Sequence, residues 1–426
     1  MMPLTVLLAG PRFARQTGGL ERALADLVRG LRDLGFDVDD ATGATGVPEA
    51  DASTRAPART ALARLNRHPW LLERWSRLDA TRRRALRDVF LRRETIEHDA
   101  LLLRDLEQRL ASRRHDVVLY CIEEAPRGGL AFALARHPCV IPVAIEGLAA
   151  ELSTPPLLER WLRWRGASAH PWFGARASAH AIRCAILSSR AWADATVRAG
   201  LARDAAHAVY FGVPLPARVR PDRPFDGRLL YVGRLVKDKG LHVLLGGVAR
   251  TRAMDRRTRL TIVAGDGPPG YRALLERRIA DLGLADAVEW RAPLPRAALG
   301  ALYAEHDALL FWSPFVEPAP LVAMEAMAAR LPAVVPRPAR ESPIYEDGIT
   351  CVTYDRNDAD SLARAIGGLA SDALHYRRIA DAGAARIADS FTPLHTARAY
   401  AQILVSAIAP AASRPDMHSS AVPSSA

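Results

Sequence analysis

The only two lysines of the chain stand in one short loop, at a spacing that suits phosphate chemistry. The sequence holds 58 Lys and Arg together, but only Lys237 and Lys239 are lysine. Both follow Arg234 within "VGRLVKDKG", residues 232–240, between an expected strand and a glycine. Lysine carries a compact point charge, whereas arginine carries a wide planar fork, so a site for one phosphate oxygen can favour lysine. We expect Lys237 to be a solvated charge, which leaves Lys239 as the candidate.

A second candidate site holds two glutamates with seven residues between them, in "FVEPAPLVAMEAMAARLPAVV". Glu317 follows an expected strand, and Glu325 falls inside the expected helix Leu321–Ala329. A helix cap and a solvated charge would explain both. However, Glu325 has apolar sequence neighbours on both sides, and a buried carboxylate is costly without polar partners. Ligand hydroxyls would be suitable partners, and the helix start favours an anion beside Leu321 and Val322.

Three glycine-bearing turns follow expected strands: Gly18–Gly19, Gly233, and "GDGP" at Gly265–Pro268. Glycine lets backbone N–H groups approach a phosphate, and the N-terminus of the next helix adds a favourable partial charge. We expect "GDGP" to be a structural turn. Two such turns on different sheets could face each other, which suits a nucleotide held between two domains.

Strand-like and helix-like segments alternate along the chain and must position these residues. Expected strands of the first half are Thr5–Ala9, Phe36–Ala41, Asp116–Cys121, Val140–Ile145 and Ile182–Leu187. Those of the second half are Leu229–Val232, Leu260–Ala264, Val288–Arg291, Ala308–Trp312, Ala333–Val335 and Cys351–Tyr354. Helical spacing separates them, for instance over Leu20–Leu34, His242–Arg252 and Tyr271–Leu282. This alternation predicts an α/β fold with parallel sheets covered by helices on both faces.

The chain of 426 residues is long enough for two or three domains. A proline cluster between residues 214 and 224 indicates a linker, so we expect domains over residues 1–216 and 217–391. The first should contain an Arg-rich helical insert at about 55–114. Thr392 and Pro393 predict the start of a last helix, over 392–410, and residues 411–426 are expected to be disordered.

Composition excludes several classes of protein. The four cysteines form no C-x-x-C pair and the histidines have no metal-binding spacing, so neither a disulfide framework nor a metal site is expected. No apolar run approaches the ~18 residues that span a bilayer, and the first residues lack the basic region of a signal peptide. These features predict a cytoplasmic protein.

Taken in order, the motifs resemble the retaining GT-B glycosyltransferases of family 4. The match rests on "VGRLVKDKG", "IVAGDGP", the Glu317 and Glu325 pair, and "YEDG" at Tyr345–Gly348, and it is strong over residues 226–391. The first half matches more weakly, through "QTGGLERALADLVRGLRDLGFDV" and "AVYFGVPLP". The resemblance implies two Rossmann-like domains facing a central cleft. The donor would lie on the second domain and the acceptor on the first, and the final helix would pack back on the first.

The resemblance also implies roles for single residues. Arg234 and Lys239 would hold the diphosphate of a UDP- or GDP-sugar, without a metal ion or other cofactor. Glu317 would contact the transferred sugar and Glu325 the ribose. The donor phosphate would help to deprotonate the acceptor, so no carboxylate nucleophile is required. Backbone amides would complete the phosphate site, those of Leu321, Val322 and Gly18 or Gly19.

Three positions depart from the family pattern. Pro318–Ala319–Pro320 stands where the family has a Gly-aromatic-Gly loop, which removes two backbone amides near the sugar. "RPARESPIYEDG" adds Arg337 and Arg340. Glu146, in "VAIEGL", stands where the family often has a histidine, so we expect Glu146 near the sugar. These changes bear on the identity of the sugar more than on the reaction class.

The net charge of +11 is concentrated in residues 55–114, which hold 16 Arg against 8 Asp and Glu. Such a block attracts nucleic acid, anionic lipid or acidic substrates. It is the only support for an Arg-rich nucleic-acid-binding protein, and no groove-reading motif accompanies it, so no nucleic acid is expected as a partner. A sugar-nucleotide epimerase of the same fold is a further alternative, against which the glutamate pair argues.

The basic block also contains aromatic residues, and "WLRWRGASAHPWFGAR" adds four more, Trp161, Trp164, Trp172 and Phe173. Arginine with Trp and Phe suits the headgroup level of an anionic membrane. We therefore expect reversible contact of the first domain with the inner face of the plasma membrane, and a glycan or lipid-linked acceptor. Amphipathic helices whose apolar faces lie in the core explain the same pattern, and both interpretations stay open at this point.

Overall fold

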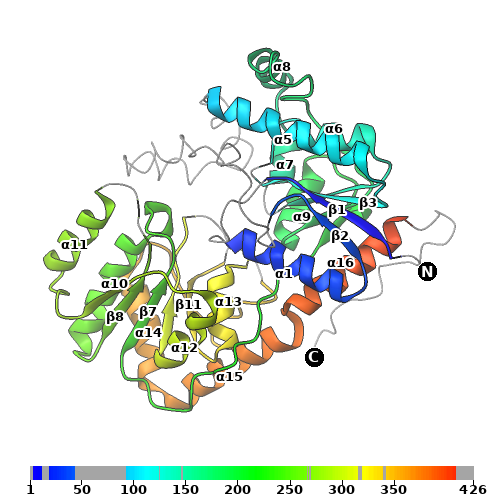
Figure 1. Ribbon diagram of the computed structural model, residues 1–426. Coiled ribbons are helices and arrows are strands. Elements are labelled where there is room, and N and C mark those ends of the chain that lie inside the picture. The colour runs from blue at the N-terminus through cyan, green and yellow to red at the C-terminus, as the bar shows by residue number, and fades with distance from the viewer. Residues whose placement is uncertain are drawn as a thin grey trace.

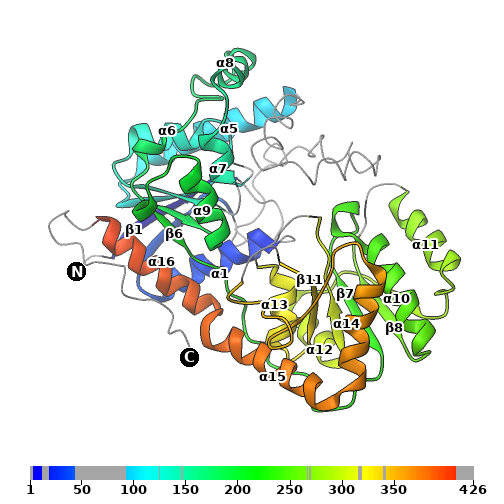
Figure 2. The same ribbon diagram turned by 180° about the vertical axis from the view of Figure 1, so that it is seen from behind.

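The structure, a computed structural model, describes residues 3–11, 19–43, 93–123, 125–144, 147–265, 267, 270–314, 319–338 and 342–408. It contains two six-stranded sheets in which every strand pair is parallel, with helices packed around them (Figures 1 and 2). The α/β class and the parallel sheets predicted from the alternation of segments are confirmed.

The first sheet, with strand order β2-β1-β3-β4-β5-β6, is built from the first half of the chain, which we call the first lobe. Its strands are β1 Thr5–Ala9, β2 Asp37–Asp40, β3 Val117–Cys121, β4 Val140–Ala144, β5 Ala185–Leu187 and β6 Ala206–Ala208. Its α-helices are α1 Gly19–Asp33, α5 Arg93–Ser112, α6 Gly129–Arg136, α7 Gly147–Leu152, α8 Pro156–Arg165 and α9 Arg190–Arg198. Two short 3₁₀ turns, Ala179–Ala181 and Arg203–Ala205, complete it.

The second sheet, with order β12-β11-β10-β7-β8-β9, forms the second lobe. Its strands are β7 Arg228–Val232, β8 Arg259–Val263, β9 Val288–Arg291, β10 Ala308–Leu310, β11 Ala333–Pro336 and β12 Val352–Tyr354. Its helices are η4 Lys237–Lys239, α10 Leu241–Met254, α11 Tyr271–Asp281, α12 Arg296–Glu305, α13 Leu321–Ala328, α14 Ala359–Ser371 and α15 Ala373–Ser390, and α16 Pro393–Ile408 follows them in the chain. No helix among the described residues is long and apolar enough to cross a lipid bilayer.

The central strands are apolar throughout because both faces of each sheet are covered. All five residues of β3, "VVLYC", are buried. Val117 and Leu119 pack in a core that includes α1, whereas Val118 and Tyr120 pack in a second core that includes α6, since successive side chains point to opposite faces. A continuous apolar run is the sequence pattern expected of such a strand.

The last helix, α16, follows the second lobe in sequence but packs against α1 of the first lobe (Figures 1 and 2). A Cβ atom at Gly30 would lie only 2.6 Å from Cβ of Ala397, so the absence of a side chain at Gly30 allows the two helices to approach. Tyr400 and Leu404 belong to the same core as Val6. The first lobe therefore depends on a segment almost 200 residues downstream of its last strand, β6.

The proline-rich connection between the lobes is anchored to the second lobe by a buried ion pair. Nη2 of Arg220 lies 3.0 Å from Oδ1 of Asp307, and these residues expose only 3% and 0% of their surface. Nη1 of Arg223 donates to the same oxygen at 2.6 Å. The segment expected to be a polar linker thus holds a buried arginine and is fixed in place at residue 220.

Some element bounds differ from those expected. β5 begins at Ala185 and β10 ends at Leu310, so both strands are shorter than their apolar runs, and β6, "AHA", has no apolar run that could predict it. Residues 55–92 and the tail 411–426 lie outside the described residues. Within the Arg-rich block the structure describes α5 and the residues that follow it.

Candidate active site

The expected phosphate and ribose residues gather at the carboxyl edge of the second sheet, at its topological switch point. β7 lies between β10 and β8, so the chain leaves β7 toward one side of the sheet and reaches β10 on the other. Ligands of open α/β sheets bind in the crevice outside the carboxyl ends at such a point. The segment after β7 carries Arg234 and Lys239, and the segment after β10 leads to α13, which carries Glu325.

The N-termini of α1 and α13 meet at the junction of the two lobes. A Cβ atom at Gly19, the first residue of α1, would lie 3.5 Å from Cδ1 of Leu321, the first residue of α13. The hydroxyl of Tyr345 donates to the carbonyl oxygen of Pro320 at 3.1 Å and fixes the start of α13. The first amides of a helix have no partner within it, and they carry a partial positive charge. The amides of Leu321 and Val322 therefore lie where two helix starts favour an anion.

The loop that holds Lys239 has a fixed backbone. Gly240 has a φ of 58°, in the left-handed region that favours glycine. A Cβ atom there would lie 1.9 Å from the Trp312 ring, so any other residue would displace this contact. The hydroxyl of Tyr231 donates to the carbonyl oxygens of Arg234 and Lys239, at 3.3 and 3.4 Å. The loop therefore presents its cations from a rigid support.

The three cations of this loop have different surroundings. Arg234 is exposed, whereas Lys239 is half-buried and its Nζ lies 5.8 Å from the centre of the Phe311 ring, directly after β10. Lys237 is also half-buried, and this burial lowers its pKa. Lys237 is thus less solvated than we expected, while Lys239 is the lysine in contact with the segment that leads to α13.

Glu325 is buried, with 6% of its surface exposed, and its carboxylate contacts side chains from two other helices. The hydroxyl of Tyr303 in α12 donates to Oε2 at 3.2 Å, and burial together with the charge of Glu325 holds the pKa of Tyr303 well above its usual value. Nε of Arg296, in α12, lies 3.1 Å from Oε1, and Nη1 of Arg22, in α1, lies 3.9 Å from it. Oε1 nevertheless accepts no hydrogen bond. The polar partners expected for Glu325 are present as protein groups, and one oxygen can still accept a ligand hydroxyl.

Sequence reasoning assigned no role to Arg22, Asp26, Arg296 or Tyr303, which surround Glu325. Asp26 carries a signal that could have been noticed, because this acid stands between Ala25 and Leu27 in the apolar part of α1. Arg296 carries another, because a cation at the first position of a helix opposes the helix dipole. The sequence could not show that these residues, 270 positions apart, meet in one cluster.

Three expected site residues, Gly18, Glu146 and Glu317, lie outside the described residues, as do Pro318 and Arg340. Their predicted roles therefore remain predictions. The loop that replaces the family's Gly-aromatic-Gly segment is described only from Ala319 onward.

Two other positions singled out from the sequence have structural partners. A Cβ atom at Gly267 would lie 2.0 Å from the carbonyl oxygen of Leu235, so this glycine of "GDGP" permits two loops to pack closely. Arg337 forms ion pairs with Asp347 and Asp355, each at 3.2 Å. The charge of Arg337 is therefore neutralised at the end of β11.

His242, at the start of α10, is a neutral histidine beside the lysine loop. Its Nδ1 lies 3.0 Å from the hydroxyl of Tyr271. Burial, with further contributions from Arg278 and Lys237, lowers the pKa of His242 to about 4. The imidazole therefore adds no charge to this edge of the sheet near neutral pH.

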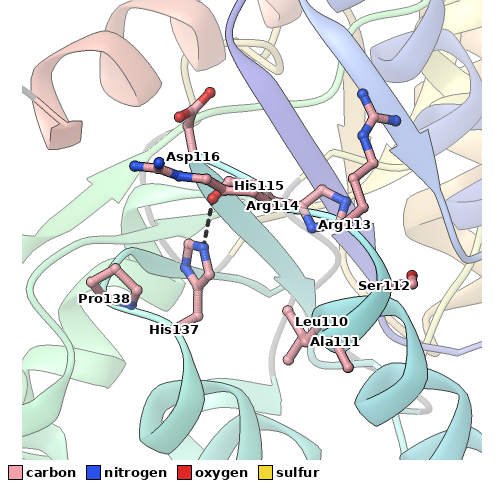
Figure 3. Close-up of a pocket in the computed structure, with 9 residues that line it drawn as sticks. All are labelled: Leu110, Ala111, Ser112, Arg113, Arg114, His115, Asp116, His137 and Pro138. Carbon is pink, nitrogen blue, oxygen red and sulfur yellow. Dashed lines mark hydrogen bonds between the residues drawn. The ribbon is translucent and has the colours of Figure 1, made fainter.

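A pocket of about 470 Å³ lies elsewhere, between the end of α5 and the start of β3 (Figure 3). Nε2 of His137 donates to the carbonyl oxygen of His115 at 2.9 Å, and Arg113 is paired with Asp37. These polar groups stabilise the amino edge of the first sheet. The pocket is therefore separate from the site at the junction of the lobes.

Comparison with known proteins adds family evidence to this geometry. The family model "Glycosyl transferases group 1" matches residues 223–386. A D-inositol 3-phosphate glycosyltransferase of Stackebrandtia nassauensis is 34% identical over 193 residues, 44% of this chain and 43% of that protein. A GDP-mannose-dependent alpha-(1-6)-phosphatidylinositol monomannoside mannosyltransferase of Mycolicibacterium smegmatis is 32% identical over 35% of this chain and 40% of its own length. The chain thus spans less than half the length of these relatives.

The fold is similar over a much longer part of the chain. The crystal structure of Anabaena HepE in complex with UDP-glucose covers 95% of this chain and 100% of its own, with a TM-score of 0.63 at 18% identity. The arrangement of two parallel six-stranded sheets, each in its own lobe, is what this match supports. The chain has the GT-B fold, and its residues 223–386 match the family model of group 1 glycosyl transferases.

Proposed function

We propose that the protein transfers a sugar from a UDP- or GDP-sugar to a glycan or lipid-linked acceptor, with retention of the anomeric configuration. The observation that carries this proposal is the meeting of the α1 and α13 N-termini, with Leu321 against Gly19. Lys239, whose Nζ lies 5.8 Å from the centre of the Phe311 ring directly after β10, supplies a cation at the same edge of the sheet. A diphosphate fits between two helix starts and a fixed cation. Glu325, one turn into α13, then lies at the distance of the adjoining ribose.

The proposed chemistry needs stabilisation of a leaving group. Cleavage of the sugar–phosphate bond leaves negative charge on the diphosphate and positive character on the anomeric carbon. Arg234, Lys239 and the amides of Leu321 and Val322 stabilise the diphosphate in this scheme, because fixed charge and dipoles at the developing charge lower the barrier. Glu317 contacts the transferred sugar, and a donor phosphate oxygen takes the proton of the attacking hydroxyl.

These roles make the proposed reaction independent of a metal ion or other cofactor, since the protein's own cations meet the diphosphate. The expected measurement is transfer activity that persists after extensive treatment with EDTA. Loss of activity with EDTA, and its return with Mg²⁺ or Mn²⁺, would contradict this part of the proposal.

Related proteins support a nucleotide-sugar donor and leave the base open. HepE is described with UDP-glucose, and the mannosyltransferase is named as dependent on GDP-mannose. The second relative acts on a phosphatidylinositol mannoside by its name, which supports a lipid-linked acceptor. Neither the epimerase nor the nucleic-acid-binding alternative is favoured by these relatives.

The direct test is binding of nucleotides by calorimetry, followed by transfer assays with the preferred nucleotide's sugars. We expect UDP or GDP to bind and to raise the melting temperature, while AMP does neither. Release of free nucleoside diphosphate should then depend on an added acceptor. A protein that binds neither UDP nor GDP, under conditions where it is folded by circular dichroism, would refute the proposed donor class.

We further propose a peripheral contact with anionic membrane, made by α8. This helix lies at the end of the first lobe away from the second lobe (Figures 1 and 2). Its outward residues Leu157 and Trp164 are 77% and 75% exposed. Leu158 and Leu162, on the inward side, pack in a small core with α5. The helix is therefore attached by one face and presents apolar side chains on the other.

Arginines flank this exposed apolar stripe. At 100° per residue, Arg160 and Arg165 fall on opposite sides of the line through Leu157 and Trp164. Arg165 also lies 4.8 Å from the centre of the Trp161 ring. Apolar residues flanked by arginine on both sides suit the level of anionic headgroups. Phe173, by contrast, is wholly buried, so its predicted contact with a membrane is wrong, because it fills the core beneath α8.

Liposome co-sedimentation tests this contact. We expect binding that rises with the fraction of anionic lipid and falls as salt approaches ~0.5 M, because salt screens exposed charges. The double variant Leu157→Ser/Trp164→Ser should lose binding. Leu374→Ser, at a 61% exposed position of α15, is the control and should keep it. Equal binding by all three proteins, or no binding at low salt, would overturn the contact.

A further inference from the structure

An ion-pair bridge joins the two lobes next to the proposed ribose site. Arg296 lies in α12 of the second lobe and contacts two carboxylates at once. Its Nη1 donates to Oδ2 of Asp26, in α1 of the first lobe, at 2.6 Å. Its Nε lies 3.1 Å from Oε1 of Glu325. Asp26 and Glu325 expose only 8% and 6% of their surface, so the bridge is largely removed from water.

The position of Arg296 is unfavourable for its own helix. It is the first residue of α12, directly after the cap Pro295. A cation there opposes the partial positive charge of the helix N-terminus. The charge of Arg296 therefore does not stabilise α12. The favourable interactions of its side chain are those with Asp26 and Glu325.

Only an arginine can make both contacts from this position. Two different nitrogens of one planar guanidinium serve two carboxylates that come from different lobes. A lysine has one ammonium group at the end of a flexible stem and cannot reproduce the fixed separation of Nε and Nη1. The bridge thus depends on the shape of the guanidinium as well as on its charge.

Glu325 is held but not saturated by these contacts. Tyr303 supplies a hydrogen bond to Oε2, and Arg296 orients the other oxygen by charge. Oε1 and Nε, although 3.1 Å apart, do not have hydrogen-bond geometry, and each is a buried polar atom without a hydrogen-bond partner. A buried acceptor that accepts no hydrogen bond carries a desolvation cost. A ribose hydroxyl is a donor that would complete it.

We propose that Arg296 is a positioning residue that ties the ribose-binding carboxylate of Glu325 to Asp26 of the first lobe, so that affinity for a nucleoside diphosphate depends on contact between the lobes. This inference rests on the proposed function. Asp26 does not touch the nucleotide in this scheme. It fixes the guanidinium, the guanidinium fixes Glu325, and closure of the lobes and donor binding strengthen each other by the same factor.

Calorimetric titration of the full chain with UDP and GDP, with a double-mutant cycle, tests the bridge. We expect Asp26→Asn to weaken binding of the preferred nucleotide by about 5–30-fold, and Arg296→Lys to weaken it at least as much. The double variant Asp26→Asn/Arg296→Lys should bind no more weakly than Arg296→Lys alone, because both changes break one bridge. In steady state the loss should appear in KM for the donor more than in kcat.

The matched control is Asp99→Asn. Asp99 forms a buried ion pair with Arg127 at 3.1 Å in the same lobe, away from α12 and α13. Its substitution disturbs the lobe to a similar degree and should leave nucleotide affinity unchanged. Glu325→Gln adds a check, because Asp26→Asn should have little further effect once Glu325 has lost its charge.

The outcomes separate the two proposals. A wild-type protein that binds no UDP or GDP refutes the proposed function, and this inference with it. Wild-type binding combined with unchanged affinity in Asp26→Asn, or with additive losses in the cycle, overturns the bridge alone. Should Asp26→Asn fail to fold, Arg296→Lys measured against Arg296→Ala decides: recovery of full affinity by lysine shows that charge suffices and contradicts the bridge.

Discussion

Replacing Lys239 with alanine should slow sugar transfer by ~10²–10³-fold, as loss of one fixed charge stabiliser does. The side chain is half-buried, beside Phe311, on a loop whose backbone is fixed by Tyr231 and Gly240. One pair of unit charges at about 4 Å interacts by ~4 kcal/mol at an effective dielectric constant of about 20, and by ~1 kcal/mol in bulk water. A half-buried site belongs in the upper part of this range. A loss of ~2.7–4 kcal/mol of transition-state stabilisation corresponds to the stated factor in rate.

The assay is single-turnover transfer with saturating donor, so that the rate of the chemical step is read directly. Lys237→Ala is the matched control, because Lys237 has the same charge and lies two residues away in the same 3₁₀ turn. We expect this control to keep its rate within about threefold, since its charge lies outside the proposed diphosphate site. Melting temperatures of both variants should stay close to that of the wild type, which separates catalysis from folding.

Equal losses in the two variants would refute the reasoning, since they would mean that the overall positive field of the loop matters and the place of Lys239 does not. An unchanged rate in Lys239→Ala would also refute the proposed role of Lys239. Lys239→Arg adds information: a partial recovery is expected, because the charge returns while the wider fork misses one phosphate oxygen.

Three further predictions concern the carboxylates and a histidine. Glu325→Gln should weaken binding of UDP or GDP by about 1–3 kcal/mol in titration calorimetry with little change for the acceptor, and unchanged affinity would refute its ribose role. Asp307→Asn should lower the free energy of unfolding in urea by ~3–5 kcal/mol, because Arg220 is left buried without its anion. The control Asp286→Asn removes a 74% exposed partner of Arg252 and should lower the free energy of unfolding by less than ~1 kcal/mol. Similar losses of stability in Asp307→Asn and Asp286→Asn would contradict the importance of the buried pair. Burial lowers the pKa of His242 to about 4 from 6.5, so the unfolded chain binds the extra proton between these values and stability falls as the pH drops through them, by up to ~3 kcal/mol. In urea unfolding between pH 4 and 7, the stability of His242→Gln should lack this part of the pH dependence. If the stability of His242→Gln and of the wild type changes with pH in the same way, His242 is not its source.

The sequence predicted the layout of the fold because local signals and burial agreed along most strands. β1, β9 and the start of α16 lie where the apolar runs and the Thr392–Pro393 pair indicated. β6 was missed because three residues, "AHA", carry no periodicity, and the anchored linker was missed because Arg220 gives no sign in sequence that it is buried against Asp307.

The candidate site was predictable only where residues follow each other in one motif. Lys239 and Glu325 stand in segments whose composition is unusual by itself, so each could be singled out. Asp26 and Arg296 are each unusual in their own helices, but nothing in either helix names the other as its partner, and their pairing arises only when the two lobes meet. Pairing across 270 positions depends on how two separately folded sheets dock, and no local pattern encodes that.

The return of α16 to the first lobe has a consequence for how the chain folds during synthesis. Tyr400, Ile403 and Leu404 complete a core whose other buried members are made more than 180 residues earlier, the last strand of that lobe ending at Ala208. At translation rates of about 5–20 residues per second, the first lobe waits on the order of 10–40 s for this helix. During that interval the face of α1 around Gly30 is uncovered, while the second lobe folds from a continuous stretch of chain. The N-terminal half of the protein is therefore the half that matures last, and its exposed apolar face is the surface that a chaperone would meet at the ribosome.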